Sequence, residues 1–259
     1  MIDLIRAEVL KLRSTRTALG LLIAAIVVSV GPAILVMSLF PRDLLEGEEG
    51  AMAAAATGLT LVPVLAVVFG ILGMTNEYRH GTITYTYLAT PRRLLVIAVK
   101  LICYALVGAA VMAITALLVV AVIALVTALR GIGSPSWLDT ATVSDAETLR
   151  DIGMFLVAVG FMTGFGVGLG ALFRAQVPTV AGVLIWALAI ENIITAVRPG
   201  VGIYLPFTVF MQLNFGPTAS TGDGGLQLLS RPEAFLLSLA YIAVVSTAAV
   251  YISMRRDVT

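Results

Sequence analysis

The side chains best suited to chemistry or docking gather in one short run of this sequence. Glu77, Arg79 and His80 directly follow a long apolar stretch, and Gly81 and an aromatic segment come next. Charges at a helix end, then a glycine, then a Pro-Arg-Arg step predict a compact element docked on another surface. The candidate docking residues are Glu77, Tyr78, Arg79, His80, Gly81, Thr82, Tyr85, Tyr87, Leu88, Pro91, Arg92 and Arg93.

The local conformation of this loop, residues 76–93, is open to two interpretations. The threonines at 82, 84 and 86 alternate with apolar or aromatic residues, which is the period of a strand. Ile83, Tyr87 and Leu88 would instead share one face of a helix. A third interpretation has no docking role, because tyrosines and arginines also form the belt that side chains make at lipid headgroups.

Several kinds of site are excluded by the residue inventory. Cys103 is the single cysteine and His80 the single histidine, so an intrachain disulfide and a Cys/His metal cluster are both ruled out. Lys11 and Lys100 are the two lysines, and a leucine follows each, so the chain has no phosphate-binding Gly-Lys-Ser/Thr loop. We therefore expect no enzymatic activity and no cofactor in this chain, and any ATP that drives it must bind elsewhere.

One carboxylate lies within the apolar segments. Glu191, beside Asn192, is nearer the outer end of the fifth such segment. An ionisable group at that depth is a functional candidate, facing a polar cavity or a partner. The alternative is that Glu191 reaches the outer headgroups, only about 9 Å away at about 1.5 Å per residue.

Small residues recur in the fourth apolar segment. Gly160, Gly164 and Gly168 are spaced four apart, which places them on one helix face where two backbones can approach closely. This face is predicted to pack on another helix of the same subunit or of a partner subunit. The nearby Gly-x-Gly-x-Gly run is not a dinucleotide-binding fingerprint, because no strand precedes it.

Composition identifies the class of protein that must position these residues. The 259 residues are 59% hydrophobic and 12% charged, whereas a soluble domain has about a quarter charged residues. A membrane-spanning helix needs about 20 apolar residues. The fold class is therefore predicted to be an all-α integral membrane protein, one transmembrane domain over 1–259, with six transmembrane helices at about 18–40, 51–75, 101–129, 152–173, 175–197 and 234–254.

The distribution of basic residues orients the six predicted spans. Eleven of the 16 lysines and arginines fall on the side that holds both termini, and this excess marks the cytoplasmic side. We expect a multi-pass protein of a bacterial cytoplasmic membrane with both termini cytoplasmic. The near-zero net charge hides this polarity.

Two further segments are apolar without being spans. Residues 2–16 place apolar residues at helical spacing, which predicts an interfacial amphipathic helix, or else a mere basic anchor. The extracellular connection 198–233 contains an apolar part too short to cross the membrane, which predicts a re-entrant segment that includes Tyr204, Leu205, Pro206 and Phe207. An ordinary structured outer loop is the alternative.

The run from Glu77 to Ile83, with Pro91-Arg92-Arg93 and then Lys100, closely resembles the loop after the second span of ABC-2 type transporter permeases. The segment from Leu4 to Arg13 resembles the N-terminal connecting helix of that family. The predicted topology matches as well, so the resemblance covers the whole chain.

The resemblance implies a permease that pairs with a second copy or a paralogous permease and with two cytoplasmic ATP-binding subunits. ATP and Mg would be bound by those subunits, and residues 76–93 would contain the coupling helix. The expected function is export of an amphipathic substrate, such as a drug, an antimicrobial peptide or a lipid-like compound. Membrane lipids, and not nucleic acid, are the other expected partners. The alternative function is a non-transporting membrane anchor or sensor that recruits a cytoplasmic protein.

Overall fold

The structure is a computed structural model that describes residues 5–8, 10–11, 16–45, 48–90, 92–132, 146–215 and 228–255. Within these ranges the regular secondary structure is helical, without a strand. The first half of the chain forms α2 (Arg16–Leu39), α3 (Arg42–Leu45), α4 (Glu48–Leu59), α5 (Val62–Arg79), α6 (Thr82–Ala89) and α7 (Arg93–Arg130). The second half forms α9 (Ala146–Phe173), α10 (Gln176–Ile185), the π-helix η1 (Trp186–Ile190), α11 (Glu191–Val197), α12 (Pro199–Gly202), α13 (Pro206–Phe215) and α14 (Arg231–Arg255).

Six helices of the described chain are long and apolar enough to cross a membrane, which confirms the predicted number. They comprise Leu22–Leu39, Ala53–Arg79, Leu94–Arg130, Leu149–Phe173, Gln176–Val197 and Arg231–Ile252. Their mean hydropathies of 2.0 to 3.0 agree with burial in lipid or protein, because water cannot solvate so much apolar surface. The protein is therefore a multi-pass, all-helical membrane protein.

The two helices that flank the predicted docking loop extend further into it than expected. Helix α5 continues to Arg79, and α7 begins at Arg93 rather than near residue 101, because the apolar residues between 94 and 99 continue its helical pattern. At about 1.5 Å per residue, the 38 residues of α7 measure about 57 Å, far more than the about 30 Å of a hydrocarbon core. The loop 76–93 is thus reduced to short turns on either side of α6.

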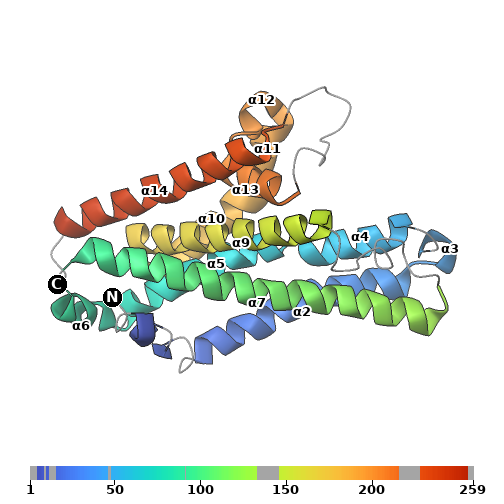
Figure 1. The fold of residues 1–259 in the computed structure, drawn as a ribbon, viewed down its shortest axis with the longest axis horizontal. Coiled ribbons are helices and arrows are strands. Elements are labelled where there is room, and N and C mark those ends of the chain that lie inside the picture. Colours follow the sequence, from blue (N-terminus) through green and yellow to red (C-terminus); the bar gives the residue numbers. More distant parts are fainter. Residues whose placement is uncertain are drawn as a thin grey trace.

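The bundle has two distinct ends (Figure 1). Helix α6, the N-terminal helical segment (residues 5–8 and 10–11) and the end of α14 gather at one end, which we call the α6 end. Helices α3 and α4 lie at the opposite end, where Arg130 of α7 donates to the Phe40 carbonyl at 3.2 Å. The very long α7 runs the whole distance between the two ends, so both are built on one continuous helix.

Helices α5 and α9 form the centre of the core, and glycines allow their close approach. A Cβ atom added at Gly70 of α5 would overlap the Thr163 carbonyl oxygen, and one added at Gly166 of α9 would overlap that of Val67. The three glycines predicted to share a packing face do not take part in this α5–α9 contact. Gly160 and Gly164 face α7, while Gly168 faces Val245 of α14. All of these contacts are made within one chain.

The fifth span and the connection after it contain the most irregular helical structure. The π-turn η1 interrupts the span, and the Asn192 amide donates to the carbonyls of Ala187 and Leu188, each at 3.1 Å. Helices α12 and α13 follow, and Gln212 of α13 donates to the Ile203 carbonyl at 2.8 Å. The predicted apolar connection is therefore a pair of short helices. The stretch 216–227 of the predicted 198–233 loop lies outside the described residues.

Candidate functional site

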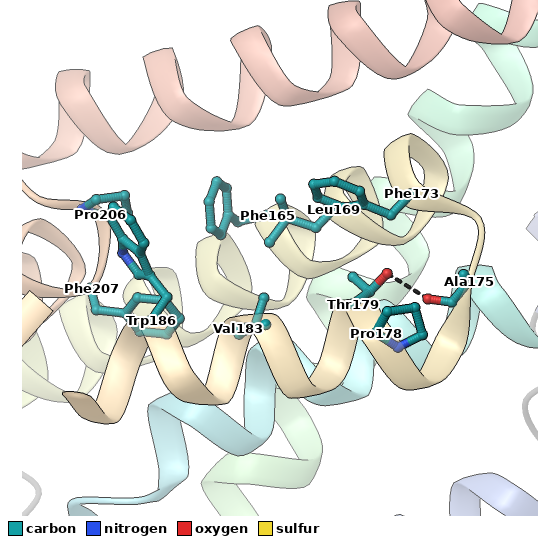
Figure 2. A pocket seen from close by; sticks show the side chains of 11 residues that line it. Phe165, Leu169, Phe173, Ala175, Pro178, Thr179, Val183, Trp186, Pro206 and Phe207 are labelled. Atoms are coloured by element: carbon teal, nitrogen blue, oxygen red, sulfur yellow. Dashed lines mark hydrogen bonds between the residues drawn. The ribbon is translucent and has the colours of Figure 1, made fainter. Parts of the chain in front are cut away.

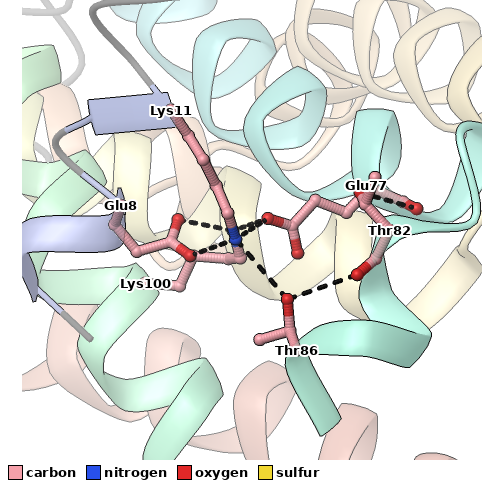
Figure 3. A network of polar contacts seen from close by, with 6 residues as sticks. All are labelled: Glu8, Lys11, Glu77, Thr82, Thr86 and Lys100. Atoms are coloured by element: carbon pink, nitrogen blue, oxygen red, sulfur yellow. Dashed lines mark hydrogen bonds and ion pairs between the residues drawn. The ribbon is translucent and has the colours of Figure 1, made fainter. Parts of the chain in front are cut away.

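Four charged side chains from three separate elements meet at the α6 end (Figure 3). The Lys100 ammonium of α7 contacts Glu8 Oε2 at 2.6 Å and Glu77 Oε1 at 2.8 Å. The Lys11 ammonium contacts Glu8 Oε1 at 2.9 Å and the same Glu77 Oε1 at 2.7 Å. Positive and negative groups therefore alternate around a ring, which we call the charge tetrad. It joins the N-terminal helical segment to α5 and α7.

The charge tetrad is almost entirely shielded from solvent. The side chain of Lys100 is 0% exposed, and those of Glu8 and Glu77 are 3% and 8% exposed. A buried charge is tolerated only where it is paired and hydrogen-bonded, and here two carboxylates balance two ammonium groups. The Lys100 ammonium also lies 5.4 Å from the centre of the Tyr104 ring, which adds a cation–π contact.

Lys11 closes the ring at its most accessible side. Burial alone would lower the pKa of Lys11, but its hydrogen bonds and charge interactions with Glu77 and Glu8 outweigh burial and raise that pKa. Lys11 is therefore a cation throughout the neutral range. Its ammonium also lies 3.5 Å from the Thr86 hydroxyl, so α6 touches the charge tetrad directly.

The local sequence explains why α6 sits beside the charge tetrad. Gly81 adopts a φ of 67°, a left-handed conformation that glycine adopts readily, and this turns the chain sharply at the end of α5. The Thr82 hydroxyl lies 3.5 Å from the Glu77 carbonyl, and the Thr86 hydroxyl donates to the Thr82 carbonyl at 3.3 Å. The question of strand or helix at 82–87 is thus decided in favour of a helix.

Helix α6 has an inner and an outer face. Ile83 and Tyr87 are buried in the main core, whereas Tyr85 and Leu88 are each 75% exposed. Glu77 and Tyr87, two of the expected docking residues, face inward: Glu77 pairs with lysines of its own chain, and Tyr87 packs into the core. The exposed apolar pair, Tyr85 and Leu88, is what this helix presents outward.

The remaining residues of the predicted loop divide between contacts to the bundle and exposed positions. The Arg174 guanidinium lies 5.5 Å from the centre of the Tyr78 ring, and Arg79 donates to the Gln176 side chain at 3.2 Å. These two contacts tie the end of α5 to the turn between α9 and α10. His80, Gly81, Thr82 and Arg92 are exposed. Arg93 is the first residue of α7, and Pro91 lies outside the described residues.

Glu191 has a structural environment that neither sequence interpretation anticipated. It is 3% exposed, and its Oε1 accepts from the Thr208 backbone N–H at 2.5 Å and from the Thr208 hydroxyl at 2.9 Å. Its Oε2 accepts from the Trp186 indole at 2.9 Å. The carboxylate therefore caps the first turn of α13 and ties it to η1, rather than reaching headgroups.

The predicted re-entrant residues lie beside this junction. Tyr204 is exposed and its carbonyl accepts from the Tyr241 hydroxyl, Leu205 and Pro206 are half-buried, and Phe207 is buried in the core. Together these contacts hold the start of α13 against η1 and α14.

Sequence reasoning located Glu77 but missed its partners. Nothing in the sequence pairs Glu77 with Glu8, Lys11 or Lys100, and Lys100 falls just outside the predicted span 101–129, whereas α7 contains it. The available signal was the isolation of Lys100: a lone lysine within a long apolar helix requires a carboxylate partner. Spacing in sequence gave no indication that Glu8 and Glu77 would supply it.

The charge tetrad and the Arg79–Gln176 hydrogen bond hold the N-terminal helical segment, α5, α7 and the start of α10 together. Within the described residues no three histidine, cysteine, aspartate or glutamate side chains lie close enough to hold a metal ion. No model of a known protein family matches the chain, and no curated protein matches it either.

Proposed function

We propose that this chain is the membrane-spanning permease subunit of an ABC-2 type exporter. It moves an amphipathic substrate, such as a drug, an antimicrobial peptide or a lipid-like compound, across a bacterial cytoplasmic membrane. Two copies of a separate cytoplasmic subunit bind ATP and Mg and supply the energy, and a second permease completes the pathway. The α6 end faces the cytoplasm, in agreement with the excess of basic residues on that side.

The observation that carries this proposal is the construction of α6. A helix of eight residues stands outside the spans, exposes Tyr85 and Leu88, and is held from behind by buried core residues and the charge tetrad. An exposed tyrosine and leucine on a rigid support suit the centre of a protein–protein contact, because large apolar side chains there contribute most of the binding energy. A rigid support is also what transmission of a push from an ATPase requires.

In this function the ATP-binding subunits move together when they bind ATP, and each displaces the α6 docked on it. Thr86 of α6 contacts the charge tetrad, which joins α5 to α7, and the Arg79–Gln176 hydrogen bond joins α5 to α10. The displacement of α6 therefore reaches the spans as a movement of helices. Helices α12 and α13 form the re-entrant segment and cap the outer end of the pathway. The alternative, a membrane anchor or sensor, would use the same exposed face to hold a cytoplasmic protein without turnover.

The test uses the exposed pair on α6. The chain is co-expressed with the ABC-type ATP-binding subunit of its own genome, purified in mild detergent, and assayed for a 2:2 complex and for ATP hydrolysis. Tyr85→Ala/Leu88→Ala is compared with Leu129→Ala, which removes a similarly exposed leucine, 77% exposed, at the opposite end of α7. We expect the double variant to weaken capture and substrate-stimulated hydrolysis at least about tenfold, since two central contacts contribute at least about 1.4 kcal/mol. Leu129→Ala should leave both intact.

Two results would overturn the proposal. Unchanged hydrolysis in the double variant would show that α6 is not the coupling surface. Capture of a cytoplasmic protein that hydrolyses no ATP would favour the anchor or sensor.

A further inference from the structure

An elongated apolar groove runs between α9 and the fifth span (Figure 2). Its volume is about 510 Å³, within the roughly 300–1,000 Å³ of small-molecule sites. Helix α9 contributes Phe165, Leu169 and Phe173 to its lining, and Trp186 lies with Phe207 at the far end. This groove is separate from the charge tetrad and from α6.

The groove walls are mainly apolar, and their two polar side chains are hydrogen-bonded within the protein. The Thr179 hydroxyl donates to the Ala175 carbonyl, as the dashed line in Figure 2 marks. The Trp186 indole donates to Glu191 instead of pointing its hydrogen at a ligand. A cavity with such walls excludes water and accepts hydrocarbon. The chemistry of the walls therefore selects an apolar occupant.

The dimensions of the groove fit one leaflet of a bilayer. Along the fifth span it extends from Ala175 to Trp186, which are eleven residue steps apart, or about 17 Å at about 1.5 Å per step. Half of a hydrocarbon core of about 30 Å is about 15 Å. Because the groove starts at the turn where the span begins, it covers the depth that one acyl chain occupies.

Positive charge lies where the headgroup of such a lipid would be. The turn between Phe173 and Ala175, both of which line the groove, carries Arg174. Its guanidinium lies over the Tyr78 ring, and its Nε and Nη2 atoms are buried without a hydrogen-bond partner among the described residues. The exposed Arg79, which binds Gln176, adds a second positive charge at the same turn. Arginine side chains favour phosphate as a partner.

We propose that this groove binds one acyl chain of an anionic membrane phospholipid, with its phosphate beside Arg174. The proposal rests on the proposed function only for naming the leaflet, which is then the cytoplasmic one. Glu191 acts as a positioning residue for the site, because it fastens both Trp186 and the start of α13, and so fixes the closed end of the groove.

Gly182 offers a direct way to fill the groove. It lines the groove, and a Cβ atom added there would have no protein atom within 4 Å. Gly153 of α9 is equally unobstructed but lies outside the groove, so Gly153→Leu is a matched control for Gly182→Leu. Trp186 reports occupancy, because Trp137→Phe leaves it as the single tryptophan of the chain.

The experiment titrates dibrominated phosphatidylglycerol into detergent micelles of the Trp137→Phe protein and measures quenching of Trp186 fluorescence. We expect saturable quenching at about one lipid per chain, at least about tenfold weaker in Gly182→Leu and unchanged in Gly153→Leu. Arg174→Gln should weaken binding of phosphatidylglycerol but not of dibrominated phosphatidylcholine. Gly182→Val, a smaller addition, repeats the comparison. No ATP-binding subunit is present, so failure here is distinguishable from failure of the proposed function.

Several outcomes would overturn the proposal. Equal affinity in Gly182→Leu would place the lipid elsewhere, and non-saturable quenching in all variants would indicate only surrounding lipid. A change of oligomeric state in Gly182→Leu with unchanged lipid binding would assign the groove to a second copy of the chain. Misfolding of both Gly182 variants while Gly153→Leu folds would show that protein fills the space. An equal effect of Arg174→Gln on both lipids would refute the role of the headgroup.

Discussion

Removal of one carboxylate from the charge tetrad tests whether the tetrad holds the α6 end together. In Glu77→Gln the shape of the side chain is kept and one negative charge is lost. The acceptor that both lysines contact at 2.7–2.8 Å then loses its negative charge, and the net charge of the cluster changes from zero to +1. Lys100 is fully buried and cannot recover hydration. Breaking a buried pair in this way costs about 3–5 kcal/mol of unfolding free energy.

The accessible lysine provides an internal comparison. Lys11 is 37% exposed, so water replaces part of what it loses, and Lys11→Met should cost only about 1 kcal/mol. The double variant Glu77→Gln/Lys100→Met leaves Glu8 and Lys11 as a neutral pair at 2.9 Å. We therefore expect it to be more stable than the sum of the single effects by about 2–3 kcal/mol.

The assay is equilibrium unfolding in mixed detergent micelles, followed by circular dichroism. Asp151→Asn is the matched control, because it removes one carboxylate from an exposed ion pair with Arg231 at 2.9 Å, and its cost should stay below about 1 kcal/mol. If Glu77→Gln and Asp151→Asn destabilise equally, the charge tetrad is not a buried network. If the two single effects simply add, Glu77 and Lys100 are not coupled.

Three further predictions follow from the packing and charges of the described residues. Gly70→Val should destabilise the fold by about 3 kcal/mol or more, because its Cβ atom would overlap the Thr163 carbonyl. Gly31→Val, at an open position, should not destabilise it. Equal yields of folded protein from the two variants would contradict the close α5–α9 packing. Glu191→Ala should speed amide hydrogen exchange in α13 at least about tenfold, because α13 loses its cap, and should leave the exchange rates in α6 unchanged. Unaltered exchange at Thr208 would refute the capping role. Because the pKa of folded Lys11 is raised above 10.5, the contribution of Lys11 to stability is complete below pH 10.5 and is lost as pH rises through the raised value. The difference in unfolding midpoint between the wild type and Lys11→Met should therefore stay constant from pH 7 to 9. A difference that shrinks within that range would disprove the assignment.

Much of the fold follows from the sequence because hydrophobic length is a local property. Each span needs about 20 apolar residues, and six such stretches can be counted without knowledge of what contacts what. The ends of the spans are harder to predict, as α7 shows. The charge of Lys100 suggests a span boundary, but carboxylate partners from elsewhere in the chain allow Lys100 to lie inside the helix. Burial of a charge depends on those partners, which are distant in sequence.

The candidate site was predicted in position but not in orientation. The run of charges after the second span lies at the α6 end of the bundle. There Glu77 and Tyr87 point inward, while Tyr85 and Leu88 point outward. The weak apolar periodicity of α6 does not decide which face is buried, since Ile83, Tyr85, Tyr87 and Leu88 are all apolar or aromatic. Only the packing of α6 on the core and on Lys11 selects the face.

The arrangement of charges explains how a short helix can be held rigidly at the edge of a membrane. The apolar contacts of Ile83 and Tyr87 attract α6 to the core but tolerate sliding, because dispersion forces have little directionality. Hydrogen-bonded ion pairs in a buried ring do not tolerate it, because a shift of one helix separates charges that water cannot reach. The same α5 terminus that carries Glu77 also carries Arg79, which holds Gln176 at the mouth of the apolar groove. A displacement of α6 large enough to disturb Glu77 therefore acts on the first turn of α10 as well. The proposed docking surface on α6 and the apolar groove are thus joined by a single helix end.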